Sequence, residues 1–341
     1  MNLSDKEKDL IIEHIKNGEK LPKEYIYKMY EDEEDVFLFW NGRNEEVTNA
    51  TLPFHSIEHI DEPRKEGKKE GDAFTMFDQK GRQLKGWTNK LIWGDNKLIL
   101  SSLVNGPIRE EIEKEGGLKL VYIDPPFAVG ADFSHNININ GENATKKQNI
   151  LEEIAYRDTW GRGLSSYLSM MYERLKLMHQ LLSDDGSIYV HIDWRVNNYL
   201  KIILDDIFGR NNFRNEIIWC YTGPGSPRMS QFNRKHDNIL WYTKSTNWHF
   251  NDSLIRIPHD AKTTGNFKSG LRGSGFIADT YELKNGKIPE DWWEMAIAQR
   301  YPIDGIKRTG YTTEKPFPLM ERIIKASSKE NELIADFFSG S

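Results

Sequence analysis

The sequence predicts an α/β protein built around a doubly wound sheet, and its central segment carries the evidence. Nearly continuous apolar runs at residues 118–123 and 187–192 are typical of strands that are buried on both faces of a parallel sheet. Between them, residues 167–182 carry apolar side chains at helical spacing. This alternation of strand and helix indicates parallel strands joined by crossover helices.

The other elements follow from the same patterns of hydrophobic spacing and turn residues. In an N-terminal accessory region of mixed α and β structure, residues 1–85, we expect helices at 5–16 and 25–30, a strand at 36–40 and a polar linker at 61–72. Beyond it we expect a short strand and turn at 91–96, helices at 98–104 and 196–208, a strand at 216–221, a helix at 316–328 and a strand at 333–338.

These elements suggest how the rest of the chain is organised. Residues 88–221 form the first, catalytic half of the predicted domain, and residues 311–341 begin a second half. Residues 222–310, between the two halves, are rich in glycine, serine and proline turns with short strands. An irregular insertion of this length in an α/β protein is more often a binding element than an idle loop.

Composition excludes several classes of protein. No apolar run approaches the roughly 20 residues that a membrane span needs, and the N-terminus is charged, so we expect a soluble cytoplasmic protein. The single cysteine, Cys220, cannot form an internal disulfide, which suits a reducing compartment. Cysteine and histidine residues lack zinc-site spacing, so we expect no metal site.

The net charge of −6 conceals a basic region. Residues 219–315 hold 14 Lys and Arg against 10 Asp and Glu, a balance of +4, together with five of the ten tryptophans. Basic and aromatic side chains interleaved in this way suit contacts with phosphates and unstacked bases. The alternative interpretation is a solvated face over a tryptophan-rich core, and composition leaves both open.

A turn rich in hydrogen-bond acceptors follows the predicted strand at 118–123, with the sequence Asp124-Pro125-Pro126-Phe127. Each proline fixes its own φ at about −65° and lacks an N–H, and Asp124 is extended because it precedes a proline. The turn therefore offers a carboxylate and backbone carbonyls but few donors. An exocyclic amino group, such as that of adenine, would pair with the Asp124 carboxylate and the Pro125 carbonyl, and Phe127 would stack on the base.

Such a site suits methyl transfer from a sulfonium donor, since that reaction needs orientation and stabilisation of the positive charge that develops on the nitrogen. Methylation of cytosine at carbon 5 would instead need a cysteine nucleophile, and Cys220 lies outside any such turn. The alternative interpretation is a stiff turn that binds no ligand.

Two further strand ends carry a carboxylate. The strand at 333–338 runs into a glycine turn, where Asp336 and the turn would serve the methionine part of S-adenosylmethionine. The segment Gly94-Asp95-Asn96 is the weaker signal, because Asp and Asn also cap helices in ordinary turns. His191 and His236 are expected to be structural hydrogen-bonding residues.

The order of these motifs resembles that of the β-class amino-methyltransferases of DNA, the permuted group in which the catalytic turn precedes the cofactor turn. The chain is especially similar to the modification subunits of type III restriction systems and their adenine-specific relatives. The resemblance covers about residues 88–341. It rests on the segments 91–96, 121–127, 167–182, 186–193, 208–219, 313–316 and 336–341.

The resemblance implies a Rossmann-like methyltransferase sheet, S-adenosylmethionine as cofactor and double-stranded DNA as partner. It assigns the target adenine to Asp124, Pro125, Pro126 and Phe127. It assigns the cofactor to Asp95, Lys315, Pro316, Asp336, Phe338, Ser339 and Gly340. Residues 219–310 correspond to the target-recognition region, with Arg228, Gln231, Asn233 and Arg234 as candidates for base-edge contacts. A restriction subunit is a further partner that the resemblance implies, and whether the chain forms a homodimer stays open.

One departure from the family pattern lies at the C-terminus. Relatives continue from the glycine turn with a helix and a strand that bears an acidic residue for the cofactor ribose, so we expect the cofactor half of residues 1–341 to be incomplete. Three interpretations follow: an adenine-specific methyltransferase, a non-catalytic DNA-binding remnant of one, and a cytosine amino-methyltransferase.

Overall fold

The chain divides into two compact units, residues 1–39 and residues 40–341. The structure, a computed structural model, describes residues 3–22, 25, 28, 38–54, 87, 89–127, 135–139, 142–146, 163–223, 230–259, 286–298 and 313–340. In the first unit, helix α1 (Asp5–Lys16) confirms the prediction for this segment. A capping box, in which the side chains of Ser4 and Glu7 each bind the other's backbone N–H, begins the helix.

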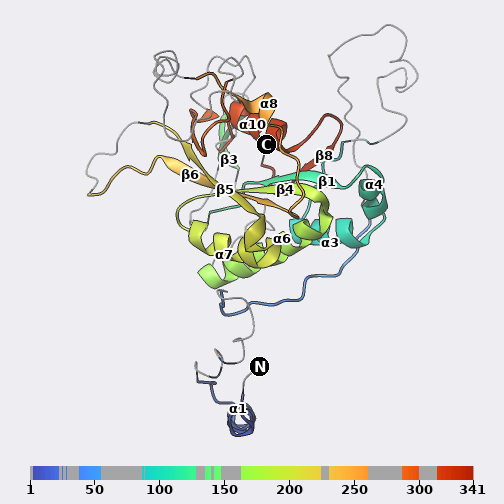
Figure 1. Cartoon of the computed structure of the whole chain (residues 1–341), viewed down its shortest axis with the longest axis vertical. Coiled ribbons are helices and arrows are strands. Elements are labelled where there is room, and N and C mark those ends of the chain that lie inside the picture. The colour runs from blue at the N-terminus through green and yellow to red at the C-terminus, as the bar shows by residue number, and fades with distance from the viewer. Residues whose placement is uncertain are drawn as a thin grey trace, which may run out of the picture. The chain divides into compact units, whose positions relative to one another are not determined.

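The second unit contains the sheet and the helices around it (Figure 1). Its helices are α3 (Asn96–Asn105), α4 (Ile108–Lys114), α6 (Leu164–Leu181), α7 (Asn197–Phe208), α8 (Asp252–Ile255) and α10 (Phe317–Ser327), with a 3-10 turn η1 (Arg210–Asn212). Its strands are β1 (Leu118–Ile123), β2 (His135–Ile139), β3 (Glu142–Lys146), β4 (Leu182–Ile192), β5 (Phe213–Cys220), β6 (His236–Thr243), β7 (Trp292–Glu294) and β8 (Leu333–Asp336).

Six of the described strands form one sheet in the order β7-β5-β6-β4-β1-β8, and β2 and β3 form a separate hairpin. Strand β1 runs parallel to β4 and to β8. Strand β6 runs antiparallel to both β4 and β5. The fold is therefore the predicted Rossmann-like α/β fold, but its sheet is mixed rather than wholly parallel.

Strand β6 corrects the expectation that the segment after Tyr221 is irregular. Residues 236–243 pair along their whole length with β4 and β5, and Ile239, Leu240 and Tyr242 are fully buried. The apolar run of these residues fits a strand that is covered on both faces. Part of the segment assigned to target recognition thus belongs to the central sheet, and the outer limits of that region stay predictions.

The strand expected at residues 91–93 does not form. The side chains of Leu91 and Trp93 are 91% and 79% exposed, and no described strand pairs with this segment. A three-residue apolar run is a weak signal, and here it belongs to an extended approach to α3. At residues 36–40 the expected strand is also wrong in its described part, since residues 38–40 form none, while residues 36 and 37 lie outside the described residues. The expected linker at 61–72 and most of the helix at 25–30 lie outside them as well.

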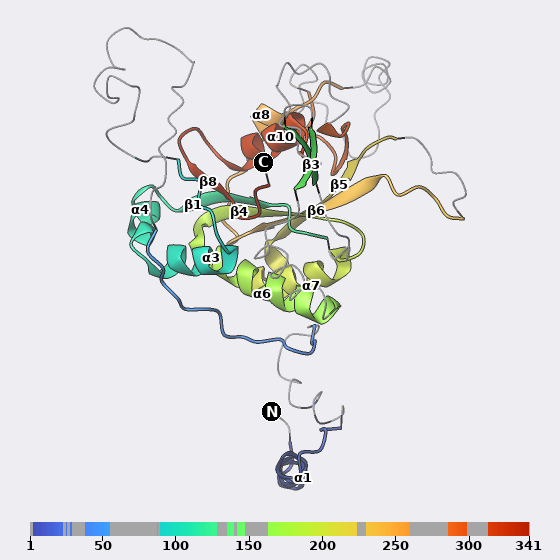
Figure 2. The ribbon, with the colours of Figure 1, turned by 180° about the vertical axis from the view of Figure 1, so that it is seen from behind.

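Helices cover the two faces of the sheet (Figure 1). Helices α3, α6 and α7 lie on one face, and α8 and α10 lie on the other, as the view from behind in Figure 2 also shows. The stripe predicted for α6, which includes Leu168, Met171 and Leu175, is buried against the sheet. None of the helices in the described part of the chain is long and apolar enough to cross a membrane.

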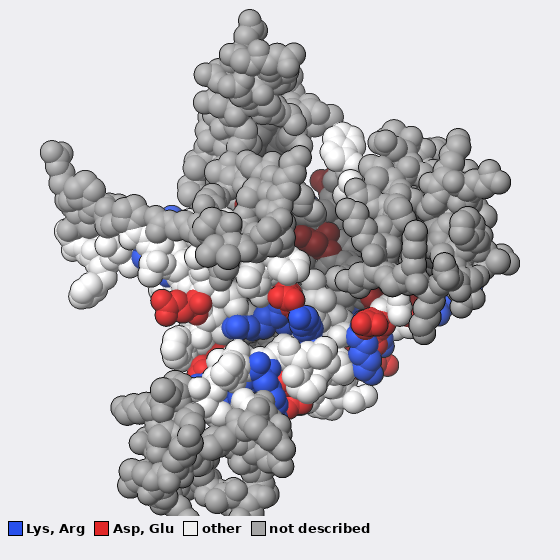
Figure 3. All heavy atoms as spheres, turned by 90° about the horizontal axis from the view of Figure 1, so that it is seen from above, with Lys and Arg blue, Asp and Glu red and all other residues white. Residues whose placement is uncertain are grey.

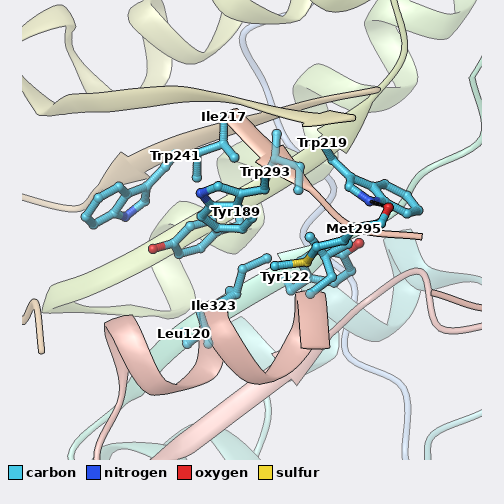
Figure 4. Packing of buried hydrophobic residues seen from close by; sticks show 11 residues of the cluster. Leu120, Tyr122, Tyr189, Ile217, Trp219, Trp241, Trp293, Met295 and Ile323 are labelled. Carbon is cyan, nitrogen blue, oxygen red and sulfur yellow. Dashed lines mark hydrogen bonds between the residues drawn. The ribbon is translucent and has the colours of Figure 1, made fainter. Parts of the chain in front are cut away.

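An aromatic cluster forms the core on the α10 face of the sheet (Figure 4). The rings of Tyr189 on β4 and Trp241 on β6 are stacked, with centroids 5.3 Å apart and an interplanar angle of 9°. Leu120 on β1 and Ile323 on α10 pack in the same cluster. Along β4 this face turns polar toward the carboxyl end, because His191 follows Tyr189 at the spacing of two residues.

The segment that follows Phe39 packs on the opposite face, against α3 and α6. The indole N–H of Trp40 donates to Ser169 Oγ (2.7 Å), and the guanidinium of Arg43 pairs with Asp206 (2.6 Å). Ser101 Oγ accepts from the backbone N–H of Ala50 (2.8 Å) and lies 2.8 Å from the carbonyl of Thr48. Residues 40–54, although assigned to the accessory region from the sequence, thus belong to the larger unit.

Substitution of Ser101 by alanine tests this attachment. Ser101 is fully buried, and the change leaves the N–H of Ala50 and the carbonyl of Thr48 without their side-chain partner. We expect the free energy of unfolding to fall by about 1–3 kcal/mol in urea denaturation. As a control, Lys114→Ala on exposed α4 should change it by less than about 0.5 kcal/mol.

Candidate active site at the carboxyl ends of the strands

The topology brings four chain segments to one edge of the sheet. Strands β1, β4 and β8 are parallel, so their carboxyl ends meet there. Strand β6 is antiparallel to β4, so its first residues lie at the same edge. Asp124, His191, Asp336 and Asp237 come from these four segments, and ligand sites of open α/β sheets lie at such edges.

Asp124 follows β1 directly, and its two carboxylate oxygens have different surroundings. Oδ2 lies 2.5 Å from the ammonium group of Lys315, which precedes α10. Oδ1 is buried and has no hydrogen-bond partner among the described residues. A buried carboxylate oxygen without a partner is costly in an apolar setting, and it marks a place where a ligand could donate a hydrogen bond.

The prolines and Phe127 shape the surroundings of this carboxylate. Pro125 is buried, whereas Pro126 and Phe127 are partly exposed. The Phe127 ring lies 5.8 Å from the imidazole of His191, centroid to centroid. Phe127 is therefore held at the edge with part of its ring open to solvent, as a stacking surface requires.

His191 is completely buried behind Asp124. Its Nδ1 lies 2.9 Å from the hydroxyl of Tyr122 and 3.6 Å from Asp124 Oδ1. Its Nε2 lies 3.3 Å from Asp237 Oδ2. Burial, with a smaller contribution from Asp124, raises the pKa of Tyr122 well above its usual value. The Tyr122 hydroxyl therefore stays protonated at neutral pH.

Asp336 ends β8 beside this group, in register with Tyr122 of β1. Its Oδ1 accepts a hydrogen bond from the backbone N–H of Phe338 (2.9 Å). Loss of hydration at the strand end, aided by the nearby Asp124 carboxylate, raises the pKa of Asp336 to about 6, although the Phe338 N–H and Lys315 act in the opposite direction. Asp336 is thus a carboxylate that a cation would stabilise.

The start of α3 is joined to the β8 turn. Asp95 caps α3 by accepting from the N–H groups of Lys97 (2.8 Å) and Leu98 (3.4 Å), as the capping interpretation predicted. The side-chain amide of the next residue, Asn96, donates to the carbonyl of Phe337 (3.1 Å). Asn96 in turn accepts from the guanidinium of Arg174 on α6 (2.5 Å). The hydrogen bond between Asn96 and Phe337 therefore holds the start of α3, with Asp95, beside the turn after β8.

The remaining cofactor candidates take simple positions. Pro316 is the N-cap of α10 and is buried. It therefore fixes the direction of the chain at Lys315, just before the helix begins. Phe338 is partly exposed, and Ser339 and Gly340 are exposed. Their role in cofactor binding stays a prediction.

The recognition candidates lie just before β6, at the same edge of the sheet. Gln231, Asn233 and Arg234 are exposed, while Arg228 lies outside the described residues. The guanidinium of Arg234 lies 4.0 Å from the ring centroid of Trp194, which follows β4. Where the described residues are visible from above, basic and acidic side chains lie next to one another (Figure 3).

The structure thus brings three of the predicted residues together: Asp124, Lys315 and Asp336. The sequence interpretation gave no site role to three residues beside this group and gave His191 only a structural role. Tyr122 and Asp237 contact His191, and Asn96 contacts the backbone of Phe337. The sequence held a signal for His191 and for Asp237. A polar residue near the end of a buried apolar run, such as His191, marks where a strand ends, and a carboxylate at the entry to one, such as Asp237, marks where a strand begins.

Comparison with known proteins identifies the family. The sequence profile of the N6 and N4 DNA methylases matches residues 118–341, and the chain belongs to that family. This match confirms the similarity to the amino-methyltransferases of DNA that the motifs suggested.

Individual relatives match over part of their length. The type II methyltransferase M.EcaI of Enterobacter cloacae is 29% identical over 308 residues, which cover 74% of this chain and 62% of the relative. The EcoP15I Mod subunit, a type III restriction-modification enzyme of Escherichia coli, is 29% identical over 199 residues, covering 52% of this chain and 29% of the relative. The DNA adenine methyltransferase YhdJ of Escherichia coli K12 is 24% identical over 245 residues, covering 70% and 71%. The chain spans less than two thirds of the length of the first two.

Solved structures show weaker likeness. The PvuII DNA methyltransferase, described as cytosine-N4-specific, is 17% identical, with a TM-score of 0.36 over 64% of this chain and 67% of that one. A putative DNA modification methylase from Thermus thermophilus is 15% identical, with a TM-score of 0.37 over 72% and 78%.

Proposed function

We propose that the protein is a DNA methyltransferase of the restriction-modification type that transfers a methyl group from S-adenosylmethionine to the exocyclic amino group of adenine. The observation that carries this proposal is the buried Oδ1 of Asp124, which has no described partner at the edge where the strands end. The exocyclic amino group of a base is a hydrogen-bond donor, which is the kind of partner that this oxygen lacks.

The residues at the edge fit the proposed cofactor. S-adenosylmethionine supplies a methyl group on a positively charged sulfur when it is bound. Its amino-acid end carries one ammonium and one carboxylate group. Asp336 offers a carboxylate for the ammonium group, and Lys315, already within 2.5 Å of Asp124, offers a cation for the carboxylate.

The chain's own residues would then act on the target base. Asp124 accepts an N–H of the amino group through Oδ1 and orients the nitrogen, while Lys315 holds Oδ2 and fixes the carboxylate in place. Phe127 stacks on the base. These groups lie at the carboxyl ends of the strands, so the base has to leave the duplex to reach them. Unstacking the base costs a few kcal/mol.

Adenine is favoured over cytosine for two reasons. An aspartate at the head of the catalytic turn resembles the adenine enzymes, whereas cytosine-amino enzymes commonly carry serine there. In addition, YhdJ, which matches over most of both chains, is named a DNA adenine methyltransferase. We propose also that a restriction subunit is a partner, because several relatives are Mod subunits of type III restriction-modification enzymes.

Expression in a bacterial host without DNA methylation tests the proposal. Single-molecule sequencing of the host genome should detect N6-methyladenine at one recurring sequence, and none in a host that expresses Asp124→Ala. Modified cytosine in place of adenine would reject the base assignment. An unmodified genome, in cells where the protein is soluble, would reject the function.

Cofactor binding should depend on pH through Asp336. Its carboxylate is protonated below a pKa of about 6 and then no longer attracts an ammonium group. We expect the affinity for S-adenosylmethionine, measured by calorimetry, to fall about tenfold from pH 7.5 to pH 5.0. Asp336→Asn should bind more weakly at pH 7.5 and show little change between the two. Equal pH dependence in the two proteins would contradict the role of Asp336.

Arg234 should contribute to DNA affinity. Its guanidinium is exposed, lies over Trp194 and donates to the neutral side chain of Gln231 (3.3 Å), so no described carboxylate neutralises the charge that could meet a phosphate or a base. We expect Arg234→Ala to weaken binding of duplex DNA and to lower the slope of log K against log salt by about 1, as measured by fluorescence anisotropy. Lys329→Ala, at an exposed lysine before the amino end of β8, serves as the control and should leave the slope unchanged.

A further inference from the structure

The buried hydrogen bonds around His191 determine which of its ring nitrogens carries the proton. Nε2 faces Asp237 Oδ2 at 3.3 Å, and an ionised carboxylate only accepts hydrogen bonds. Nε2 must therefore be the protonated nitrogen. In a neutral imidazole this leaves Nδ1 as an acceptor.

The partner of Nδ1 suits that assignment. The hydroxyl of Tyr122 lies 2.9 Å from Nδ1 and donates to it. Asp124 Oδ1 also faces Nδ1, at 3.6 Å, but an unprotonated nitrogen has no proton to give it. The oxygen consequently has no partner in the described structure, although it is buried against a histidine.

The contacts on both sides of the ring hold this arrangement. An N–H at Nδ1 would point at Asp124 Oδ1 and satisfy it, but the Tyr122 hydroxyl occupies Nδ1. Asp237 is held from its other side, since the hydroxyl of Tyr221 donates to its Oδ1 (3.3 Å).

We propose that Tyr122, His191 and Asp237 are positioning residues that keep Oδ1 of Asp124 a free acceptor for the amino group of the target base. This relay, the hydrogen-bonded series Tyr122–His191–Asp237, rests on the proposed methyl transfer. No covalent bond forms or breaks at these three residues. The relay keeps His191 from donating a hydrogen bond to Asp124 Oδ1, so that this oxygen stays available to the base.

The groups that face His191 come from every neighbouring element. They are Tyr122 and Asp124 from β1 and its end, Phe127 from the proline turn, Trp219 from β5 and Asp237 from β6. Lys315 and Asp336 lie beyond Asp124 and influence it by charge. Trp219 is fixed in turn, since its indole N–H donates to the carbonyl of Met295 (2.9 Å).

Nuclear magnetic resonance tests the protonation state without any ligand. In protein labelled with nitrogen-15 at its nine histidines, two-bond correlations identify the protonated nitrogen of each ring. The His191 signals are assigned by their absence in His191→Gln or, where that variant does not fold, by their shift in Tyr122→Phe. We expect a neutral ring protonated at Nε2 at pH 7.5. A ring protonated at Nδ1, alone or together with Nε2, would overturn the proposal.

Kinetics test the consequence. In Tyr122→Phe, Nδ1 loses its donor, so the ring can carry its proton at Nδ1 and donate it to Asp124 Oδ1. We expect kcat for methyl transfer to fall about tenfold, with affinity for S-adenosylmethionine unchanged. Asp237→Asn removes the acceptor-only partner that fixes the proton on Nε2, because an amide can donate as well as accept, and it should also lower kcat.

The matched control is Tyr189→Phe. This tyrosine lies on the same face of the sheet, is also buried, and bonds Ser327 Oγ (2.7 Å) as the one partner of its hydroxyl among the described residues. It should leave kcat unchanged, and equal effects of Tyr122→Phe and Tyr189→Phe would refute the relay. A wild-type protein that methylates no DNA would instead refute the proposed function, and the magnetic resonance result would stand apart from it.

Discussion

Asp124→Ala is expected to lower the rate of methyl transfer to DNA by about a thousandfold or more while the protein remains folded. The change removes the oxygen proposed to bind the amino group, and it also removes the charge that stabilises the nitrogen as it becomes positive. The loss should appear in kcat, as measured by single-turnover incorporation of labelled methyl groups. Affinity for DNA should change little, because phosphate contacts elsewhere supply most of it.

The matched control for this substitution is Asp185→Ala. Asp185 pairs with Lys119 at 2.5 Å, the distance that joins Asp124 to Lys315, but it lies at the amino end of β1. Loss of that pair should cost at most about 1 kcal/mol of stability and leave methyl transfer intact. Equal activity of Asp124→Ala and the wild type would exclude Asp124 from the reaction.

Trp241→Ala should produce the largest loss of stability among the changes considered. Trp241 is 6% exposed, and its ring stacks on Tyr189 within the cluster of Figure 4. It also contacts Phe250, which packs against that cluster. Its removal leaves a cavity between the sheet and α10. We expect the free energy of unfolding to fall by about 3–5 kcal/mol in urea denaturation.

Trp241→Phe separates packing from polarity at the same position. The indole Nε1 of Trp241 is buried without a hydrogen-bond partner among the described residues. Phenylalanine keeps an aromatic ring and removes this unsatisfied donor, so the two effects offset each other and the loss should stay below about 1.5 kcal/mol. Similar losses for Trp241→Ala and Trp241→Phe would show that this ring does not pack as described.

The sequence predicted the elements whose burial is strong and local. Strand β1 is a continuous apolar run, and α6 has one apolar stripe, so each was located to within a few residues. The segment at residues 91–93 misled because an apolar triplet indicates a strand only when a neighbouring strand can pair with it. Strand β6 was overlooked because the glycine and proline turns before it suggested an irregular region.

The site was predictable in part for a similar reason. Asp124 and Asp336 follow apolar runs directly, so their place at a strand end could be read from the chain. The contacts of His191 with Tyr122 and Asp237 could not, because they depend on the antiparallel course of β6 beside β4. The pairing of Lys315 with Asp124 joins residues 191 positions apart, and only the fold brings them together.

The identity of the methylated base distinguishes an adenine methyltransferase from a cytosine methyltransferase and from a protein that does not methylate DNA. Purified protein is incubated with unmethylated DNA and S-adenosylmethionine that carries a labelled methyl group, and the DNA is then digested to nucleosides and separated. We expect label in N6-methyldeoxyadenosine, and none with Asp124→Ala. Label in N4-methyldeoxycytidine, or DNA without label from a folded protein that binds both substrates, would contradict it.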